Sequence, residues 1–191
     1  MARILRSVDY VARPWKNGGG TTRDIAVSPP GASLDTFDWR LSLAQVDRDG
    51  PFSRFDNVNR TLVLLSGAMT LHENDRRIDL ARNEPFAFEG ERAIEARVAG
   101  GSTLDFNVMT RGGRASHTAR CESFSKRANI ETRNASTVVL FALEGGLIVD
   151  GEQLDVHDTA IITAQRVSVT TAARGAAALV IEIVDIHPNV L

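Results

Sequence analysis

Two stretches of the chain read alike: TLVLLSGAMTL begins at Thr61 and TVVLFALEGGL begins at Thr137, a separation of 76 residues. A later landmark keeps nearly the same step, since Phe106 in LDFNVM lies 75 residues before Ile181 in LVIEIV. A period of this length is too long for a solenoid, whose repeats usually span roughly 20–50 residues. The repeat therefore predicts two copies of one compact unit.

Both copies have the pattern of β-structure. Short alternating or apolar runs, separated by Gly, Asp, Asn and Pro, recur along the chain, and helical periodicity is hard to find. The predicted strands are 3–8, 23–28, 39–46, 60–65, 68–73, 76–80, 85–88, 94–99, 103–110, 136–142, 146–149, 152–156, 159–163, 167–171 and 177–185. We expect an all-β chain of two fused β-barrel or jelly-roll units. The pairs Asn74-Asp75, Gly100-Gly101 and Asp150-Gly151 are expected to reverse the chain in hairpins.

The repeat also predicts the domain limits. Residues 1–110 form the first unit and residues 136–191 the second. The polar segment 111–135 lacks clear alternation and is expected to be a connector with a helical turn near 121–128. The first 55 residues have no counterpart in the second copy, which makes them the place to look for function.

Composition excludes several classes of partner. The net charge is −2, far from the basic balance that favours nucleic acid. No apolar run approaches the roughly 20 residues that cross a bilayer, and the N-terminus lacks a secretory apolar core. The single cysteine, Cys121, excludes an internal disulfide and agrees with a reducing compartment. We expect a cytoplasmic protein that binds neither nucleic acid nor membrane.

The residues that usually carry metal or nucleophilic chemistry are scattered. The four histidines form no HxH or HxxxH pair, and no acidic residue lies between two of them at ligand spacing. There is no GxSxG nucleophile motif, and Cys121 falls in the expected connector. The glycines Gly18 to Gly20 match neither a Walker phosphate loop nor a dinucleotide-binding turn. The sequence thus predicts no metal and no other cofactor.

Two predicted strands instead carry a polar face. Alternation in WRLSLAQV places Arg40 and Ser42 on one face, and alternation in LDFNVMT does the same for Asp105 and Asn107. Arg60 opens a neighbouring strand. The faces either meet water, as in an ordinary antiparallel sheet, or line a half-polar cavity. Their mixture of Arg, Ser, Asp and Asn with small Ala and flexible Met favours the cavity.

The segment RPWKNGGGTTRDI is the most unusual part of the chain. Three successive glycines lower stability unless the backbone needs positive φ or a close approach. They are flanked by Trp15, Lys16, Asn17 and Thr21. The segment is either a tight turn whose tryptophan plugs the end of a barrel or a loop that forms one wall of a pocket.

At these residues the chain resembles a known family. The segments WKNGGGTTRDI, FDWRLSLAQVDRDGPFSRFDNVNRTLVLLSG and LDFNVM, in this order and at fitting spacing, resemble the HutD/Ves family of bacterial proteins. The resemblance implies a bicupin and a link to histidine utilisation. The chain departs from the metal-binding cupins by lacking their histidines, so neither a metal nor oxygenase activity is carried over. The residues that match the family motifs, together with the neighbouring lysine, are Trp15, Lys16, Asn17, Thr21, Arg40, Ser42, Phe52, Ser53, Arg60, Asp105 and Asn107.

Three hypotheses for function follow. The first is a regulatory protein that binds a small anionic metabolite such as urocanate or formylglutamate. The second is a metal-independent enzyme acting on such a compound, with Asp105 as base and Lys16 or Arg40 as the electrophilic group. The third is a purely structural or partner-binding protein. The second copy carries Val180 and Glu182 where the first has Asp105 and Asn107, and it is expected to serve as support or as a homodimer interface.

Overall fold

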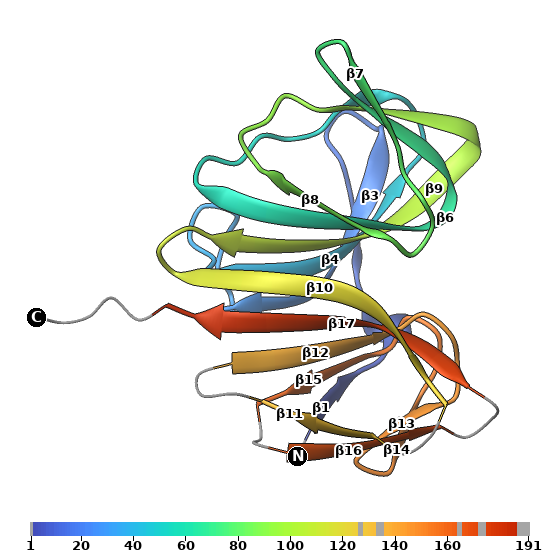
Figure 1. Ribbon diagram of the computed structural model, residues 1–191. Helices are drawn as coiled ribbons and strands as arrows, with labels where there is room; N and C mark the ends of the chain where they lie inside the picture. The colour runs from blue at the N-terminus through green and yellow to red at the C-terminus, as the bar shows by residue number, and fades with distance from the viewer. Residues whose placement is uncertain (1, 126–127, 133–135, 164–165, 172–174, 187–191) are drawn as a thin grey trace, which may run out of the picture. The chain divides into compact units, whose positions relative to one another are not determined.

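The computed structural model describes residues 2–125, 128–132, 136–163, 166–171 and 175–186 (Figure 1). Within these ranges the chain is all β, as predicted, and its only helical element is the 3-10 turn η1 (Ser7–Asp9). The strands are β1 (Ala2–Leu5), β2 (Ala12–Pro14), β3 (Gly20–Ser28), β4 (Trp39–Val46), β5 (Gly50–Pro51), β6 (Val58–Glu73), β7 (Arg76–Asp79), β8 (Pro85–Glu89), β9 (Glu95–Arg111), β10 (Ala115–Phe124), β11 (Ala128–Glu131), β12 (Ser136–Ala142), β13 (Leu147–Val149), β14 (Glu152–Leu154), β15 (Thr159–Ile162), β16 (Arg166–Thr171) and β17 (Ala176–Asp185).

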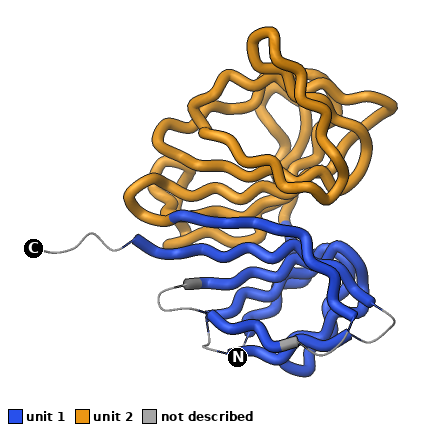
Figure 2. Tube along the Cα trace, viewed as in Figure 1, with its two compact units in different colours: residues 1–10, 116–191 blue, residues 11–115 orange. Residues whose placement is uncertain are grey.

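The strands form two compact units (Figure 2). Unit 2 is Val11–Ala115, and unit 1 combines Met1–Tyr10 with Ser116–Leu191. This division differs from the predicted limits at two points. The first ten residues belong to unit 1, because β1 pairs with β15. The expected connector contains strands β10 and β11, so the helical turn predicted near residues 121–128 is wrong for residues 121–124 and 128. Residues 126–127 of that prediction lie outside the described residues.

Unit 2 contains one sheet with the strand order β2-β3-β4-β9-β6-β7, in which β5 also pairs with β9 and β8 with β6. Its long strands β6 and β9 pair over most of their length, and the register shifts between Leu64 and Ser66 and again between Ser66 and Ala68. Such shifts bend a sheet. The order has two ends, β2 and β7, so the described sheet is open rather than the closed barrel that was predicted.

The predicted turns have mixed outcomes. Asn74 has a φ of 51° in the hairpin between β6 and β7, and Asp150 has a φ of 51° in the hairpin between β13 and β14, as expected. The prediction for Gly100-Gly101 is wrong, since β9 continues through both residues. Their positive φ values of 77° and 123° absorb the irregular register opposite Gly67 instead of reversing the chain.

Unit 1 contains a five-stranded sheet, β1-β15-β12-β17-β10, and a four-stranded sheet, β11-β16-β13-β14. Its core is apolar and includes Leu140, Leu147 and Val180. The sequence repeat reappears in the strand pairing. Val63 pairs with Phe106 in unit 2, and the residues 76 and 75 positions later, Val139 and Ile181, pair in unit 1.

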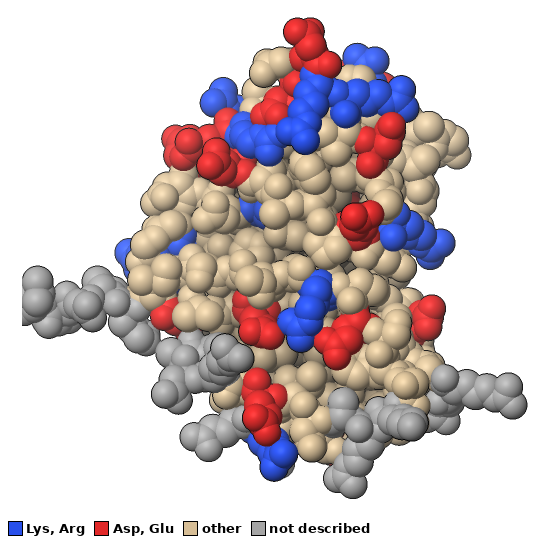
Figure 3. All heavy atoms as spheres, viewed as in Figure 1, with Lys and Arg blue, Asp and Glu red and all other residues tan. Residues whose placement is uncertain are grey.

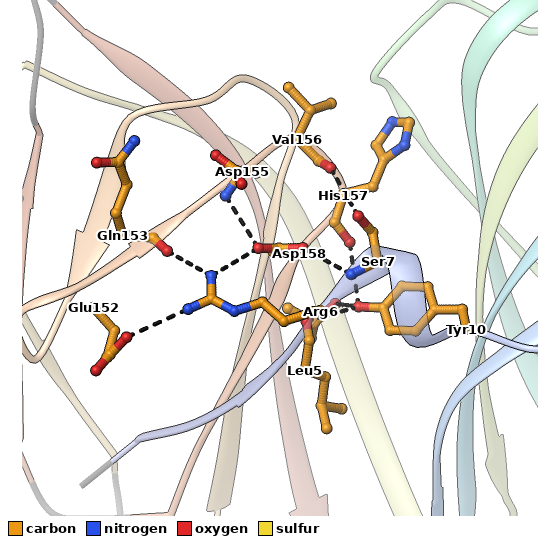
Figure 4. A network of polar contacts seen from close by, with 11 residues as sticks. Leu5, Arg6, Ser7, Tyr10, Glu152, Gln153, Asp155, Val156, His157 and Asp158 are labelled. Atoms are coloured by element: carbon orange, nitrogen blue, oxygen red, sulfur yellow. Dashed lines mark hydrogen bonds and ion pairs between the residues drawn. The ribbon is translucent and has the colours of Figure 1, made fainter.

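A buried carboxylate fixes the N-terminal residues in unit 1 (Figure 4). Asp158, whose side chain is 3% exposed, accepts hydrogen bonds from the backbone N–H of Ser7 at 2.7 Å and from Arg6 Nη1 at 2.9 Å. Tyr10 Oη lies 2.9 Å from Thr159 Oγ1 in the same network. Burial would raise the pKa of Asp158, but the hydrogen bonds from Ser7 and Arg6 outweigh it and lower the pKa.

Acidic and basic side chains are interspersed between wide uncharged areas on the face shown in Figure 3. This texture agrees with the small net charge of −2. Among the described residues, no helix combines the length and the apolar character required to cross a bilayer.

Candidate functional site

Unit 2 holds a cavity of about 630 Å³. A cavity of this size is typical of small-molecule sites. Strands β2, β3, β4, β5, β6 and β9 and the loops next to them contribute its lining residues, which are Arg13, Pro14, Trp15, Lys16, Asn17, Thr22, Asp24, Val27, Ala32, Ser33, Leu34, Arg40, Ser42, Ala44, Val46, Pro51, Phe52, Ser53, Phe55, Arg60, Asp105, Asn107 and Met109.

The polar faces of β4 and β9 meet inside this cavity. Ser42 is opposite Asn107 in the antiparallel pair, and Ala44 is opposite Asp105. Ser42, Asp105 and Asn107 are 2%, 1% and 6% exposed. The alternative in which these faces meet bulk water is therefore wrong, and the half-polar cavity is confirmed.

Arg60 is a buried cation, 7% exposed, at the start of β6. Its Nη2 donates to Asn107 Oδ1 at 2.9 Å and its Nη1 to the Ser53 carbonyl at 3.2 Å. The guanidinium carbon lies 4.9–5.6 Å from the ring centres of Phe52, Phe55 and Phe88, a cation–π arrangement. Burial lowers the pKa of Arg60 to about 10, a shift that Asp105 opposes and Arg40 reinforces.

Asp105 is the buried anion of the cavity. Its Oδ1 accepts a hydrogen bond from Asn107 Nδ2 at 2.7 Å, while its Oδ2 has no hydrogen-bond partner among the described residues. Burial raises the pKa of this carboxyl to about 7, against the opposing effects of the Arg60 charge and the Asn107 hydrogen bond. Asp105 therefore changes its charge near neutral pH.

A second arginine, Arg40, faces the cavity from β4 with a side chain that is 15% exposed. It forms an ion pair with Asp24 of β3, and its Nη1 lies 3.9 Å from Met109 Sδ. Asp24 also lies 3.7 Å from Arg13 Nη1. Arg40 thus shares one carboxylate with another cation, which leaves positive charge available to a bound anion.

The glycine-rich segment is both a turn and a wall. The Gly18 N–H donates to the Trp15 carbonyl at 2.9 Å, and Gly18 has a φ of 64°. Trp15 Nε1 donates to Thr22 Oγ1 at 2.7 Å, which holds the indole against β3. Lys16 and Asn17 line the cavity next to this indole. The loop is therefore a turn that also forms one wall of the cavity, and because the described sheet is open, the tryptophan does not plug the end of a closed barrel.

The structure brings ten of the eleven predicted site residues to the cavity. The exception is Thr21, which does not line it, because strand alternation turns Thr22 inward in its place. Sequence reasoning missed the cavity residues Arg13, Thr22, Asp24 and Phe55. A register shift between Asp24 and Ala26 interrupts the alternation of β3 that would have indicated Asp24.

The part of the chain that the structure describes offers little to a metal ion. Across the described ranges, no three His, Cys, Asp or Glu side chains gather in a metal-binding arrangement. His187 lies outside the described residues. Cys121 is exposed on β10. The absence of a metal stays a prediction.

The chain matches known proteins along most of its length. The family model for HutD matches residues 7–181. A Pseudomonas putida protein, described as an uncharacterized 21.2 kDa protein in the hutC 3′ region, is 37% identical over 142 residues, which is 73% of each chain. Protein Ves of Escherichia fergusonii is 35% identical over 137 residues, covering 70% of this chain and 64% of its own.

Solved structures support the same family relationship. A conserved protein of unknown function from Pseudomonas aeruginosa superposes with a TM-score of 0.86 at 31% identity, covering 96% of this chain and 99% of its own. HutD from Pseudomonas fluorescens gives a TM-score of 0.82 at 31% identity, with 97% and 99% covered. The bacterial pirin YhhW from Escherichia coli, at 8% identity and a TM-score of 0.66, shares only the cupin-like fold. By its motifs, its family match and its relatives, the chain belongs to the HutD family.

Proposed function

We propose that unit 2 binds a small carboxylate in its cavity and that the protein regulates histidine utilisation through this binding. The observation that carries the proposal is the pair of arginines in the cavity, Arg40 with a side chain 15% exposed and Arg60 with 7% of the residue exposed. Arginine binds carboxylates through two parallel hydrogen bonds, and such bonds strengthen away from water.

The charges of the lining favour an anion. It contains four cationic side chains, Arg13, Lys16, Arg40 and Arg60, against the two carboxyl groups of Asp24 and Asp105. A bound anion neutralises the excess positive charge and so lowers the electrostatic free energy of the site. Ser42 and Asn107 are placed to orient the bound group, and Trp15 and Phe52 supply apolar walls.

The relatives indicate the first ligands to try. The Pseudomonas putida relative is described by its position in the hutC 3′ region, and the structure of HutD from Pseudomonas fluorescens is that of a formate condition. Urocanate and formylglutamate, both carboxylates of histidine catabolism, are therefore the candidates that we propose.

We further infer that the two units are copies of one cupin-like module, which makes the protein a bicupin. The support is the equivalent pairing of Val63 with Phe106 and of Val139 with Ile181. Unit 1 fills the position of Asp105 with Val180, a core residue. It then acts either as a support or as the surface through which two chains pair.

Thermal-shift titration with both compounds tests the proposal. Ligand at 100 times its Kd should stabilise the native protein by about 2.7 kcal/mol. Arg40→Met keeps much of the side-chain volume but removes the donors, so carboxylate affinity should fall about tenfold or more. Arg77→Met, at an exposed arginine paired with Asp79, is the control that should leave the affinity unchanged. Equal affinity of the Arg40→Met variant and the native protein would contradict the proposal.

One observation favours an enzyme as the second candidate. Asp105 is a buried carboxyl whose pKa of about 7 suits a general base at neutral pH. Incubation of the protein with urocanate or formylglutamate, followed by chromatography of the products, tests this function. Turnover that disappears in the Asp105→Asn variant would favour the enzyme over the regulator.

A further inference from the structure

The hydrogen bonds that join Arg60, Asn107 and Asp105 in the cavity run in one direction, from donor to acceptor. Arginine is only a donor, so Arg60 fixes the side-chain amide of Asn107 with its oxygen toward the guanidinium. The amide nitrogen of Asn107 must then face Asp105 and donate to Oδ1. The chain of donors therefore ends on the carboxylate of Asp105.

The other carboxylate oxygen of Asp105 receives no hydrogen bond from the described residues. Oδ2 of Asp105 is buried and has no hydrogen-bond partner among the described residues. The positions beside Asp105 on β4 and β6 are Ala44 and Leu64, whose side chains carry no donor. Because the Asp105 side chain lines the cavity and is 1% exposed, a bound molecule is the natural source of the missing donor.

Building on the proposed carboxylate site, we infer that the ligand is a carboxylate that also carries an N–H or O–H group. Its carboxylate pairs with Arg40, and its N–H or O–H donates to Asp105 Oδ2. A buried polar group left unpaired is costly, so a site built this way rejects a ligand that lacks the matching donor. Asp105 is then the residue that determines specificity.

The register of the sheet sets the distance between Arg40 and Asp105, which would bind the two ends of the ligand. Arg40 is opposite Met109, which lies four residues from Asp105 along β9, so the Cα positions of Arg40 and Asp105 are roughly 13 Å apart along the strands. The two side chains shorten this gap. Ser42 and Ala44 line the wall between them, a surface that accepts a short aliphatic middle section.

Matched amide and ester probes test the inference. N-acetylglycine, N-acetyl-β-alanine and 4-acetamidobutanoate offer one to three methylene groups between a carboxylate and an N–H. Acetoxyacetate, 3-acetoxypropanoate and 4-acetoxybutanoate replace that N–H by an oxygen of nearly the same size. Calorimetric titration at about pH 8, above the pKa of about 7 for Asp105, should show at least one amide binding about tenfold or more tightly than its ester.

Two variants test whether Asp105 causes the preference for the amide over the ester. In Asp105→Asn, Asn107 still donates to the side-chain oxygen, so an NH₂ donor replaces the Oδ2 acceptor, and the preference for the amide should disappear or reverse. Arg40→Met should weaken amide and ester alike and leave their ratio unchanged. Because the amide-to-ester ratio is measured on the native protein, the test does not depend on either variant folding.

The outcomes separate the two proposals. Equal binding of amide and ester at all three spacings overturns the inference and leaves the carboxylate site standing. An amide preference that persists in Asp105→Asn also overturns it, because Asp105 would not be the acceptor. Absence of binding by every probe to the native protein overturns the carboxylate site and the inference together.

Discussion

Asp105 and Arg60 carry opposite charges in the cavity, and Asn107 bridges them through two hydrogen bonds of 2.7 Å and 2.9 Å. The carboxyl gains too little from this bridge to offset its loss of water, which is why its pKa is raised to about 7. The folded protein therefore holds a proton on Asp105 at pH values where the unfolded chain has released it. This difference makes stability depend on pH.

Asp105→Asn should flatten that dependence. Since the folded pKa lies above the ordinary value of 3.8, the native free energy of unfolding falls as pH rises from about 4 to about 7 and is level above. The asparagine variant lacks this loss and should be the more stable protein at about pH 8, by an amount on the order of a few kcal/mol. Urea unfolding at about pH 5 and pH 8 measures it.

Asp56→Asn, at an exposed aspartate, is the matched control and should change stability by less than about 0.5 kcal/mol at either pH. If the free energy of unfolding of the native protein depended on pH in the same way as that of the Asp105→Asn variant, the raised pKa of Asp105 would be contradicted.

Gly20 of β3 lies close against the backbone of β4. A Cβ atom there would lie 2.1 Å from the Gln45 carbonyl oxygen, so the backbone itself stands in the way. Gly20→Ala should force the strands apart and destabilise the protein by about 1–3 kcal/mol. Gly50→Ala in β5 is the control, because nothing lies within 4 Å of its Cβ position. Equal melting temperatures of the two variants would show that β3 yields freely.

The junction of η1 and β15 should be sensitive to acid. The hydrogen bonds of Asp158 hold its pKa below the ordinary value, so their contribution is present above about pH 4 and is lost as pH falls through the folded pKa. Asp158→Ala should lower the free energy of unfolding by about 2–4 kcal/mol at pH 7, and by less in acid. Glu152→Ala, at the exposed partner of Arg6, should cost less than about 1 kcal/mol. Denaturant unfolding at both pH values checks the contrast.

Strand period explains what could be predicted from the sequence. Alternation predicts that Arg40 and Ser42 share one face of their strand and that Asp105 and Asn107 share one face of theirs, because alternation within one strand is a local property. Thr21, which the family motif indicates, does not line the cavity, because the choice between it and Thr22 depends on how β3 pairs with β4. Pairing across many residues is not visible in any window of sequence. The same limit applies to β10, whose polar, half-exposed residues resemble a loop until β17 pairs with it.

Chelators are expected to leave the thermal stability of the protein unchanged. Within the described part, no cluster of His, Cys, Asp or Glu is arranged to hold an ion, and the cavity presents cations rather than a carboxylate cage. Incubation with EDTA should leave the melting temperature unchanged, and elemental analysis should find no stoichiometric metal. One tightly held equivalent of a transition metal would contradict this expectation.

Unit 1 is interrupted along the chain, since Ala2 of β1 pairs with Ile162 of β15 and all of unit 2 lies between them. During translation, residues 11–115 leave the ribosome before β12, β15 and β17 have been made. The cavity can therefore assemble on the nascent chain, whereas β1 must wait with its edge unpaired until β15 emerges. The unit that holds the cavity is thus synthesised as one uninterrupted piece, and the unit that surrounds it in sequence is completed last.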